Sequence, residues 1–466
     1  MARKKTRNLL WLLIIILLFL GSFFILNLSI FEKNAPQILV EDTLYTNLKS
    51  PLLVKVKDEE SAVKSIKIVL KKDDNDPGVI LADGKIKQDK EVSLQINLPK
   101  QAYKDKTNSY LLEIWAKDTS FWNFNGNEAY FWNFNGNEAY KKVVVMIDNE
   151  APKLNIISNS YHIEQGGAAS VVFKAEDANL KELFIETNKG RIFKVTPYLK
   201  KDYYAALIAW DAKDEEFRAY VVAKDAAGNI AKERIRYYLL NRKYRVSNIN
   251  LSDKFLDGKI ESLASIYAPK NNTFTRFEKF KFVNETLRLS NEELIHKITS
   301  SVPEESFGEF NINLFLPLKN AAKVADFADH RYYSYNGQFV SDSYHMGLDL
   351  ASTSEAPIIS NNAGRVVFAE ENGIYGLNLI LYHGFGIYSL YGHCSSSNVE
   401  LNESVAKNSI IAKTGVSGLA LGDHLHFGIL VQGVETRPEQ WQDKKWLENN
   451  IYKVFNDAKK VIMGTR

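Results

Sequence analysis

Five side chains in the C-terminal part of the chain have the chemistry to hold a metal ion and to move protons. Four are histidines and one is an aspartate, in three short pieces: His345, Asp349, His393, His424 and His426. Imidazole and carboxylate are common ligands of Zn²⁺, and a catalytic zinc site keeps one coordination position open. Histidine also titrates near neutral pH and serves as a general acid or base. The set therefore predicts a catalytic zinc site with additional histidines beside the metal.

The spacing inside two of these pieces predicts β-strands. Residues 344–350 place His345 and Asp349 on one parity and apolar residues on the other, and side chains two apart on a strand share a face. An i, i+4 pair also suits a helix, but the glycine midway and the apolar alternation favour a strand. His424 and His426 lie at i and i+2, which share a face only in a strand. Each pair is therefore expected to point to one surface.

The three pieces together resemble a known family. His345-x-x-x-Asp349, Tyr391-Gly392-His393 and His424-Leu425-His426-Phe427 resemble, in this order, the signature pieces of the lysostaphin-like (LytM-type) zinc metalloendopeptidases, which are peptidoglycan hydrolases. The resemblance covers roughly residues 315–434. It implies an antiparallel β-sheet peptidase domain with one zinc ion, ligated by His345, Asp349 and His426, and with His393 and His424 as catalytic residues. No His-Glu-x-x-His motif occurs, so the thermolysin arrangement is absent.

The chemistry expected of such a site follows from the ligand count. Three protein ligands leave zinc an open position for water, whose pKa falls to about 7 when bound. His393 and His424 can accept the water proton, protonate the leaving amine or stabilise the oxyanion, and the sequence does not divide these roles. The expected function is cleavage of peptide crosslinks of peptidoglycan in cell-wall remodelling, by attack of zinc-bound water. The alternative is a non-catalytic wall-binding scaffold or an activator of another wall hydrolase.

Other candidates are weaker. Cys394 follows His393 directly, and neighbours on a strand point to opposite faces, so a Cys–His dyad between them is not expected. Cys394 is predicted to be a small buried residue. His383 is expected to shape a turn or the wall of the groove, and His330 to lie near the groove without binding the metal. His296 is interpreted as an ordinary surface histidine.

The N-terminus predicts a membrane anchor. Residues 1–8 are basic and residues 9–30 are almost entirely apolar, which is long enough to span a bilayer. Bulky residues continue the apolar run where a signal peptide would have a cleavage site, so a retained anchor is expected rather than a cleaved signal. The basic flank keeps the N-terminus cytoplasmic. The protein is therefore expected to be a single-pass protein of the inner or cytoplasmic membrane, with its bulk extracytoplasmic and the periplasm as the favoured compartment.

Composition excludes other classes. The chain has 466 residues, and 59 Lys plus Arg against 56 Asp plus Glu give a net charge of only +3, so no nucleic-acid partner is expected. A single cysteine excludes a disulfide framework within the chain. The expected partners are peptidoglycan stem peptides, the membrane and, through the modules described next, other proteins.

Residues 34–148 and 149–242 predict two β-rich modules of immunoglobulin-like size, because short β-branched and aromatic runs alternate with turn residues. Two short motifs recur: Asn34-Ala35-Pro36 matches Glu150-Ala151-Pro152, and Ala116-Lys117-Asp118 matches Ala223-Lys224-Asp225. Residues 224–229 predict a tight turn, with calcium binding as the alternative. The decapeptide 121–130 is repeated as 131–140, and a long hairpin or loop is expected there, either without a role or as an aromatic glycan-binding surface.

The remaining segments complete a mainly β chain. Residues 243–310 predict a partly helical linker that packs against the following domain, with Ser290 or Asn291 as the cap of a helix. Residues 311–440 form the predicted peptidase domain, and residues 441–466 the C-terminal helix. Whether the linker blocks the groove is left open by the sequence, as is the crosslink that is cut.

Overall fold

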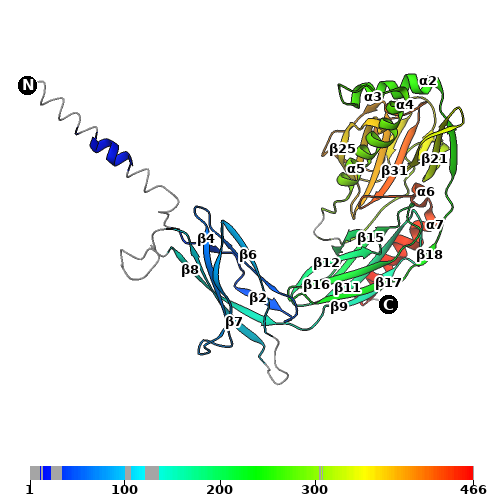
Figure 1. Cartoon of the computed structure of the whole chain (residues 1–466). Helices are drawn as coiled ribbons and strands as arrows, with labels where there is room; N and C mark the ends of the chain where they lie inside the picture. The colour runs from blue at the N-terminus through cyan, green and yellow to red at the C-terminus, as the bar shows by residue number, and fades with distance from the viewer. Residues whose placement is uncertain are drawn as a thin grey trace, which may run out of the picture. The chain divides into compact units, whose positions relative to one another are not determined.

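The computed structural model describes residues 11, 14–21, 34–99, 107–120, 136–303, 306 and 308–464, and the fold is mainly β (Figure 1). The tail 1–8 and most of the predicted anchor 9–30 lie outside the described residues. Within the described part, no helix is both long and apolar enough to cross a membrane. The chain divides into two compact units. The first holds residues 1–152, 178–181 and 224–230, and the second holds residues 153–177, 182–223 and 231–466.

The first module packs two sheets around one apolar core. Alternating residues of facing strands, such as Val54 and Ile114, are fully buried in it. One sheet has the order β1 (Gln37–Ile38), β3 (Leu52–Lys57), β6 (Glu91–Ile96). The other has the order β2 (Thr43–Thr46), β8 (Glu138–Ile147), β7 (Ser109–Asp118), β4 (Val63–Lys71), β5 (Val79–Asp89).

The aspartate of the recurring Lys-Asp motif makes the same pair of hydrogen bonds to an asparagine in both modules. In the first, the backbone N–H of Asn137 donates to Asp118 Oδ1 at 2.7 Å and its side-chain amide donates to Oδ2 at 2.9 Å. Asn229 binds both oxygens of Asp225 in the same way, each at 2.8 Å. The turn predicted over residues 224–229 is confirmed, and the buried carboxylate of Asp225 brackets it. Residues 121–135 of the duplicated decapeptide lie between the two bracket residues of the first module and outside the described residues.

The second module has two four-stranded sheets. One has the order β14 (Thr196–Pro197), β15 (Tyr203–Ala209), β11 (Ala168–Glu176), β9 (Lys153–Asn159). The other has the order β13 (Ile192–Lys194), β12 (Leu180–Thr187), β16 (Ala219–Asp225), β17 (Ile230–Ile235). A short parallel pair, β10 (His162–Glu164) and β18 (Tyr238–Leu240), adds to them.

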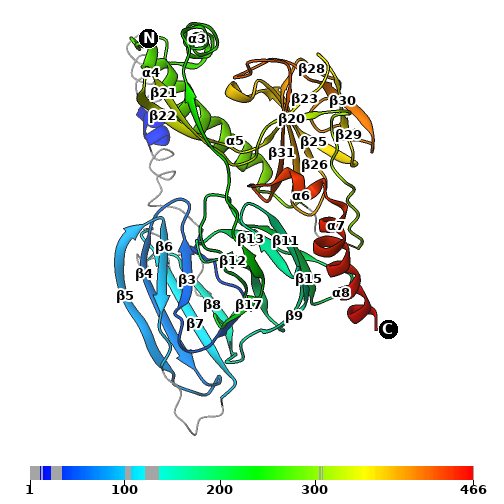
Figure 2. The same cartoon turned by 90° about the vertical axis from the view of Figure 1, so that its right-hand side faces the viewer.

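The C-terminal helices pack on the second module. Helices α6 (Pro438–Trp441), α7 (Lys444–Leu447) and α8 (Lys453–Met463) end the chain, and a π-helical turn joins the last two. Helix α8 packs against β9 and β11, and Figure 2 shows it beside this sheet. Ser160 Oγ donates to the Asn450 carbonyl at 2.9 Å, and Arg437 pairs with Glu164 at 2.9 Å. The second module is therefore part of the same compact unit as the C-terminal domain.

The segment before the C-terminal domain is helical and packs on it. It holds α2 (Asp253–Phe255), α3 (Glu261–Tyr267), α4 (Arg276–Lys281) and α5 (Arg288–Thr299), with π-helical turns at residues 256–260 and 282–287. The predicted cap at Ser290 or Asn291 is wrong, because the continuous helix begins earlier, after a capping box of Thr275 and Glu278. Asn291 is buried and its side-chain oxygen instead accepts from the backbone N–H of Ile374 at 2.9 Å.

The C-terminal domain is built on a large antiparallel sheet. Its order is β20 (Ala322–Ala325), β23 (Leu348–Ala351), β31 (Leu425–Val431), β27 (Ile387–Cys394), β26 (Leu377–Tyr382), β25 (Gly364–Glu371), β29 (Ser404–Val405), with β32 (Val434–Thr436) on β31. Beside it lie two three-stranded sheets. These are β24 (Pro357–Ser360), β30 (Ser409–Lys413), β28 (Ser396–Ser397), and β19 (Val246–Asn250), β21 (Asp329–Tyr335), β22 (Gln338–His345).

Candidate metal centre and active site

Three of the five predicted residues meet in one cluster. His345 Nε2 lies 3.0 Å from Asp349 Oδ1, and His426 Nδ1 lies 2.9 Å from the same oxygen. Asp349 and His426 are directly opposite in the antiparallel pair β23–β31. The prediction of one continuous strand over 344–350 is wrong, because β22 ends at His345 and β23 begins at Leu348 in a different sheet. The i, i+4 pair converges because the chain crosses between two sheets within that interval.

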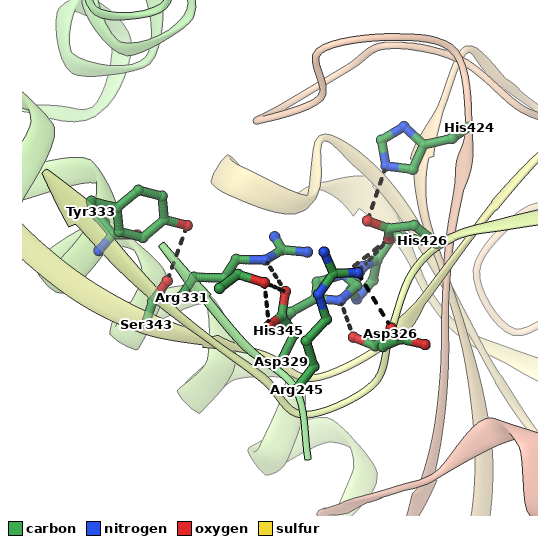
Figure 3. A network of polar contacts seen from close by, with 12 residues as sticks. Arg245, Asp326, Asp329, Arg331, Tyr333, Ser343, His345, His424 and His426 are labelled. Carbon is green, nitrogen blue, oxygen red and sulfur yellow. Dashed lines mark hydrogen bonds and ion pairs between the residues drawn. The ribbon is translucent and has the colours of Figure 1, made fainter. Parts of the chain in front are cut away.

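The orientation of the rings leaves ligand atoms facing one point. The Nδ1–H of His345 donates to the backbone carbonyl of Asp326 at 2.8 Å, so the lone pair of Nε2 faces the cluster (Figure 3). That atom is 3.0 Å from His426 Nδ1 as well as from the Asp349 carboxylate. Two ring nitrogens and a carboxylate oxygen at such separations form a donor set for a cation that prefers nitrogen and oxygen ligands. The residues therefore fit a zinc ion.

Burial fixes the protonation states that a metal requires. His345, Asp349 and His426 are only 6%, 9% and 5% exposed. Burial lowers the pKa of His426 to about 4, so its imidazole is neutral at physiological pH. Burial alone would raise the pKa of Asp349, but His345 and His426 outweigh it and hold that pKa well below its ordinary value. A neutral imidazole beside a carboxylate anion is ready to bind a cation without releasing a proton.

Close packing behind the ligands depends on a glycine. A Cβ atom at Gly347 would lie 2.4 Å from Cε1 and Nε2 of His426 and 3.0 Å from the carbonyl oxygen of Phe427. No side chain fits there unless the His426 ring moves. The crossing between the two sheets therefore requires glycine at position 347.

The other two histidines stand beside the cluster. The ring centroid of His393 is 4.7 Å from that of His424 and 5.8 Å from that of His426. The Nδ1–H of His393 donates to the Ser417 carbonyl at 2.9 Å, and the Nδ1–H of His424 donates to the Gly422 carbonyl at 2.7 Å. In both rings Nε2 is therefore the atom that remains for substrate chemistry. His424 Nε2 lies 3.7 Å from Asp349 Oδ2.

The backbone and the charge state of His393 are unusual. Its φ is +62°, in the left-handed region that non-glycine residues rarely adopt, at an irregularity in the pairing of β26 with β27. Burial, with smaller contributions from the charges of His426 and His424, lowers its pKa to about 3. The imidazole is consequently neutral and has a free acceptor nitrogen. This geometry is decided by tertiary structure and has no signal in the local sequence.

Cys394 and His383 are placed outside this constellation. Cys394 is buried, burial raises the pKa of its thiol to about 12, and Sγ lies 3.6 Å from the Tyr391 carbonyl. His383 bonds to the Ala363 carbonyl at 2.8 Å and to Ser389 Oγ at 2.6 Å. It is therefore a structural residue and does not line the groove.

His330 and His296 also have partners away from the proposed metal ligands. His330 stacks on Tyr344 with centroids 4.1 Å apart, and its Nε2 lies 2.7 Å from Asp342 Oδ2. His296 is half-buried and lies 2.7 Å from a carboxylate oxygen of Glu435. His296 is thus a paired residue rather than the free surface histidine expected from the sequence.

The cluster lies in a groove of about 510 Å³ that has two unlike sides. We call β23, β27 and β31 the floor, because they carry Asp349, His393 and His426. We call β19 and β21 the wall. In β21, alternate residues line the groove, namely Asp329, Arg331 and Tyr333. In β19, the consecutive residues 247–250 line it, together with Arg245 just before the strand, which is counted with the wall. The linker strand β19 therefore forms one side of the groove and leaves its volume open. The sequence reasoning missed these residues, and only the period of two in β21 is visible in the sequence.

Comparison with known proteins identifies the domain that carries this groove. Residues 343–438 match the model of peptidase family M23. The chain carries an M23 peptidase domain at its C-terminus. The match spans all five residues of the constellation, in agreement with the family expected from the sequence motifs.

Several curated proteins are similar to this M23 domain. An uncharacterized metalloprotease of Haemophilus influenzae is 30% identical over 124 residues, 26% of each chain. The DD-carboxypeptidase/endopeptidase Mpg of Neisseria meningitidis is 28% identical over 94 residues, 20% of this chain and 22% of the relative. The murein hydrolase activator EnvC of Escherichia coli is 29% identical over 109 residues, 23% of this chain and 26% of the relative. The chain thus spans about a quarter of the length of these relatives.

Proposed function

We propose that this protein is a zinc metalloendopeptidase that cleaves the peptide crosslinks of bacterial peptidoglycan. The observation that carries the proposal is the convergence of a His-Asp-His ligand set and two further histidines in one groove. A relative named as a DD-carboxypeptidase/endopeptidase supports the substrate class. His345, Asp349 and His426 would hold the metal, and His393 and His424 would be the catalytic residues.

The protein side chains have separable tasks in this proposal. Bound zinc would supply a Lewis acid that polarises a carbonyl and acidifies water. Burial holds His426 as a neutral ligand, and the Asp326 carbonyl fixes the tautomer of His345. His393 and His424 each keep Nε2 free after their Nδ1–H groups bind backbone carbonyls. They can therefore accept a proton from water and return one to the leaving amine.

The proposed location is the extracytoplasmic face of a membrane. The basic residues 1–8 and the apolar residues 9–30 support a retained single-pass anchor with a cytoplasmic N-terminus. The two β modules would then act as a spacer between the membrane and the wall, and their surfaces are available for protein partners. Treatment of spheroplasts with an external protease tests this topology. The C-terminal domain should be digested, and its survival would exclude the proposed topology.

Digestion of muropeptides tests the proposed activity. Full-length protein, purified in detergent and loaded with zinc, should convert crosslinked muropeptide dimers into monomers, and a chelator should abolish the conversion. Mass analysis of the products identifies the bond that is cut. Protein with one zinc per chain and no effect on any crosslinked dimer would overturn the proposal.

A second candidate is a scaffold or activator of another wall hydrolase. The similarity to a protein named as a murein hydrolase activator supports it. It predicts that His424→Ala, which leaves the three ligands in place, still rescues a deletion strain. The peptidase proposal predicts that the same variant fails to rescue while it is present at normal abundance.

A further inference from the structure

The wall of the groove carries positively charged side chains that the proposed hydrolytic chemistry does not use. Arg245 and Arg331 both line the groove that holds the four histidines. Ser247 and Arg331 are paired in register in the parallel strands β19 and β21, and Arg245 is two residues before Ser247. Side chains two apart on a strand share a face, so both arginines project from the same side of the wall. Figure 3 shows both extending toward the region of His345 and His426.

A buried carboxylate holds Arg331 in place. Asp329 is 4% exposed, and its oxygens accept from Ser247 Oγ at 2.8 and 3.0 Å. The Nε–H of Arg331 donates to Asp329 Oδ2 at 3.2 Å. Only Nε makes this bond, and within the described part of the chain the two terminal nitrogens of Arg331 have no hydrogen-bond partner. The guanidinium is therefore held in place through Nε. Its two terminal nitrogens remain available in the groove, where they can donate to both oxygens of a carboxylate.

The other cations near the wall are paired with carboxylates. Arg245 lies 3.6 Å from Asp326, the same carboxyl group contacts Lys323, and Lys323 also lies 3.9 Å from Glu439. These four groups balance in charge, so the preference for an anion rests on the terminal nitrogens of Arg331. The side chain of Arg245 is 61% exposed and that of Arg331 is 22% exposed, so solutes can reach both.

The strand register sets the distance between Arg331 and the cluster of His345, Asp349 and His426. Asp329 is directly opposite His345 in the pair β21–β22, and Arg331 is two residues further along the strand. Two residues of a strand span roughly 7 Å. An extended peptide has a similar rise, so Arg331 is in reach of a group one or two residues from the bond held at the cluster.

We propose that Arg331, assisted by Arg245, binds a free carboxylate of the substrate within two residues of the scissile peptide bond. This inference rests on the proposed peptidase function and specifies its substrate class as an acidic peptide. A primary amide in place of the carboxylate would lose the charge-assisted pair with the guanidinium. The wall would therefore discriminate between the acid and the amide, while the floor performs the hydrolysis.

The test compares a set of substrates on the full-length, zinc-loaded protein in detergent. One is a synthetic crosslinked stem-peptide dimer with all carboxylates free. The others are the same dimer with each carboxylate converted in turn to a primary amide. For wild type, one of the amides should lower kcat/KM by about 10- to 100-fold, as expected for a charge-assisted hydrogen-bonded pair.

Variants of the wall arginines then test whether the wall causes the preference for the carboxylate over the amide. Arg331→Gln should slow cleavage of the all-acid dimer to about the rate of the amide, and leave the rate on the amide unchanged. Arg331→Lys should keep part of the preference, because lysine keeps the charge without the fork. Arg245→Gln should cause a smaller loss. Arg365→Gln removes an exposed arginine from β25 outside the groove and should have no effect.

Each failure has a distinct meaning. Wild type that cleaves all dimers equally, or Arg331→Gln that slows acid and amide alike, would overturn the carboxylate site. A preference that survives in Arg331→Gln would do the same. If Arg331→Gln loses zinc or unfolds, the Arg331→Lys and Arg245→Gln variants decide the question. Zinc-loaded wild type that cleaves no dimer would instead overturn the peptidase function itself.

Discussion

The floor and the wall of the groove are built from different kinds of sheet. Every residue of β27 and β31 in the floor is buried, whereas β21 and β22 next to it include exposed residues. The floor presents histidines and an aspartate whose positions are set by packing on both faces. The wall presents arginine, serine and aspartate, and its position depends on the strands and helices behind it. In the proposed function, the fully buried sheet would carry bond cleavage and the partly exposed one substrate recognition.

The helical segment supports the wall. Phe280 of α4 is 1% exposed and packs edge-on against Tyr333 of β21, with ring centroids 5.2 Å apart. The amide of Asn284 donates to Ser341 Oγ at 2.9 Å and to the Asp342 carbonyl at 3.1 Å. The predicted linker is therefore an integral part of the domain that holds the groove, because one apolar cluster joins it to the peptidase strands.

The largest expected effects concern two histidines of the floor. His426→Ala should lose both zinc and activity, because it removes a ligand. His393→Ala should retain zinc and lose activity by about 10²- to 10⁴-fold, the usual contribution of proton transfer. His330→Ala, in the wall strand but facing away from the groove, is the control and should retain both. Zinc content by atomic absorption and muropeptide turnover provide the readouts. Equal zinc loss in the first two variants would show that the ligand assignment is wrong.

The next prediction compares a buried side chain of the helical segment behind the wall with an exposed side chain beside it. Phe280→Ala should lower the free energy of unfolding by about 3–4 kcal/mol, because it removes a buried aromatic side chain and leaves a cavity. Phe339→Ala removes a side chain of β22 that is 65% exposed and should change stability little. Denaturant titration of the zinc-loaded protein measures both. A small loss for Phe280→Ala would show that the helical segment folds independently of the wall.

A smaller effect is expected where floor and wall meet. Gly347→Ala should weaken zinc binding by about 10-fold or more, because its Cβ atom displaces the His426 ring. Gly422→Ala is the matched control in the same region, since a Cβ atom there has open space around it. Competition with a fluorescent chelator measures the two affinities. Unchanged zinc affinity in Gly347→Ala would indicate that the crossing between the sheets can shift.

The smallest predicted effect is a pH dependence of stability behind the floor. Burial lowers the pKa of His383 to about 4, below the ordinary value of 6.5. The unfolded state therefore takes up a proton first as the pH falls, and stability decreases between about pH 6.5 and 4, by about 1 kcal/mol at pH 5.5. His383→Gln should flatten this part of the profile, measured by denaturant titration from pH 7 to 5. An unchanged slope would show that other groups cause the acid sensitivity.

Sequence reasoning worked where local spacing carries the information. The motifs around His345, His393 and His424 indicated the family, and the tight turn over residues 224–229 followed from turn chemistry. It failed where partners are distant. Asn291 is predicted by its residue type to be a helix cap, yet it lies inside a helix and its side-chain oxygen accepts from the backbone N–H of Ile374. The spacing of His345 and Asp349 predicts that they lie on one strand, yet they belong to strands of two different sheets.

By itself, the sequence determined which chemical groups are present and the family whose motifs they match. Residue types and short spacings specify these, since a ligand set needs particular side chains. Only the tertiary structure decided that Asp329 fixes Arg331 beside the metal cluster and that the linker strand β19 completes the groove. The bond that holds Asp329 in turn comes from Ser247, which is 82 positions away in the sequence. Pairing of distant strands sets these relations, and no local pattern records which strands will pair.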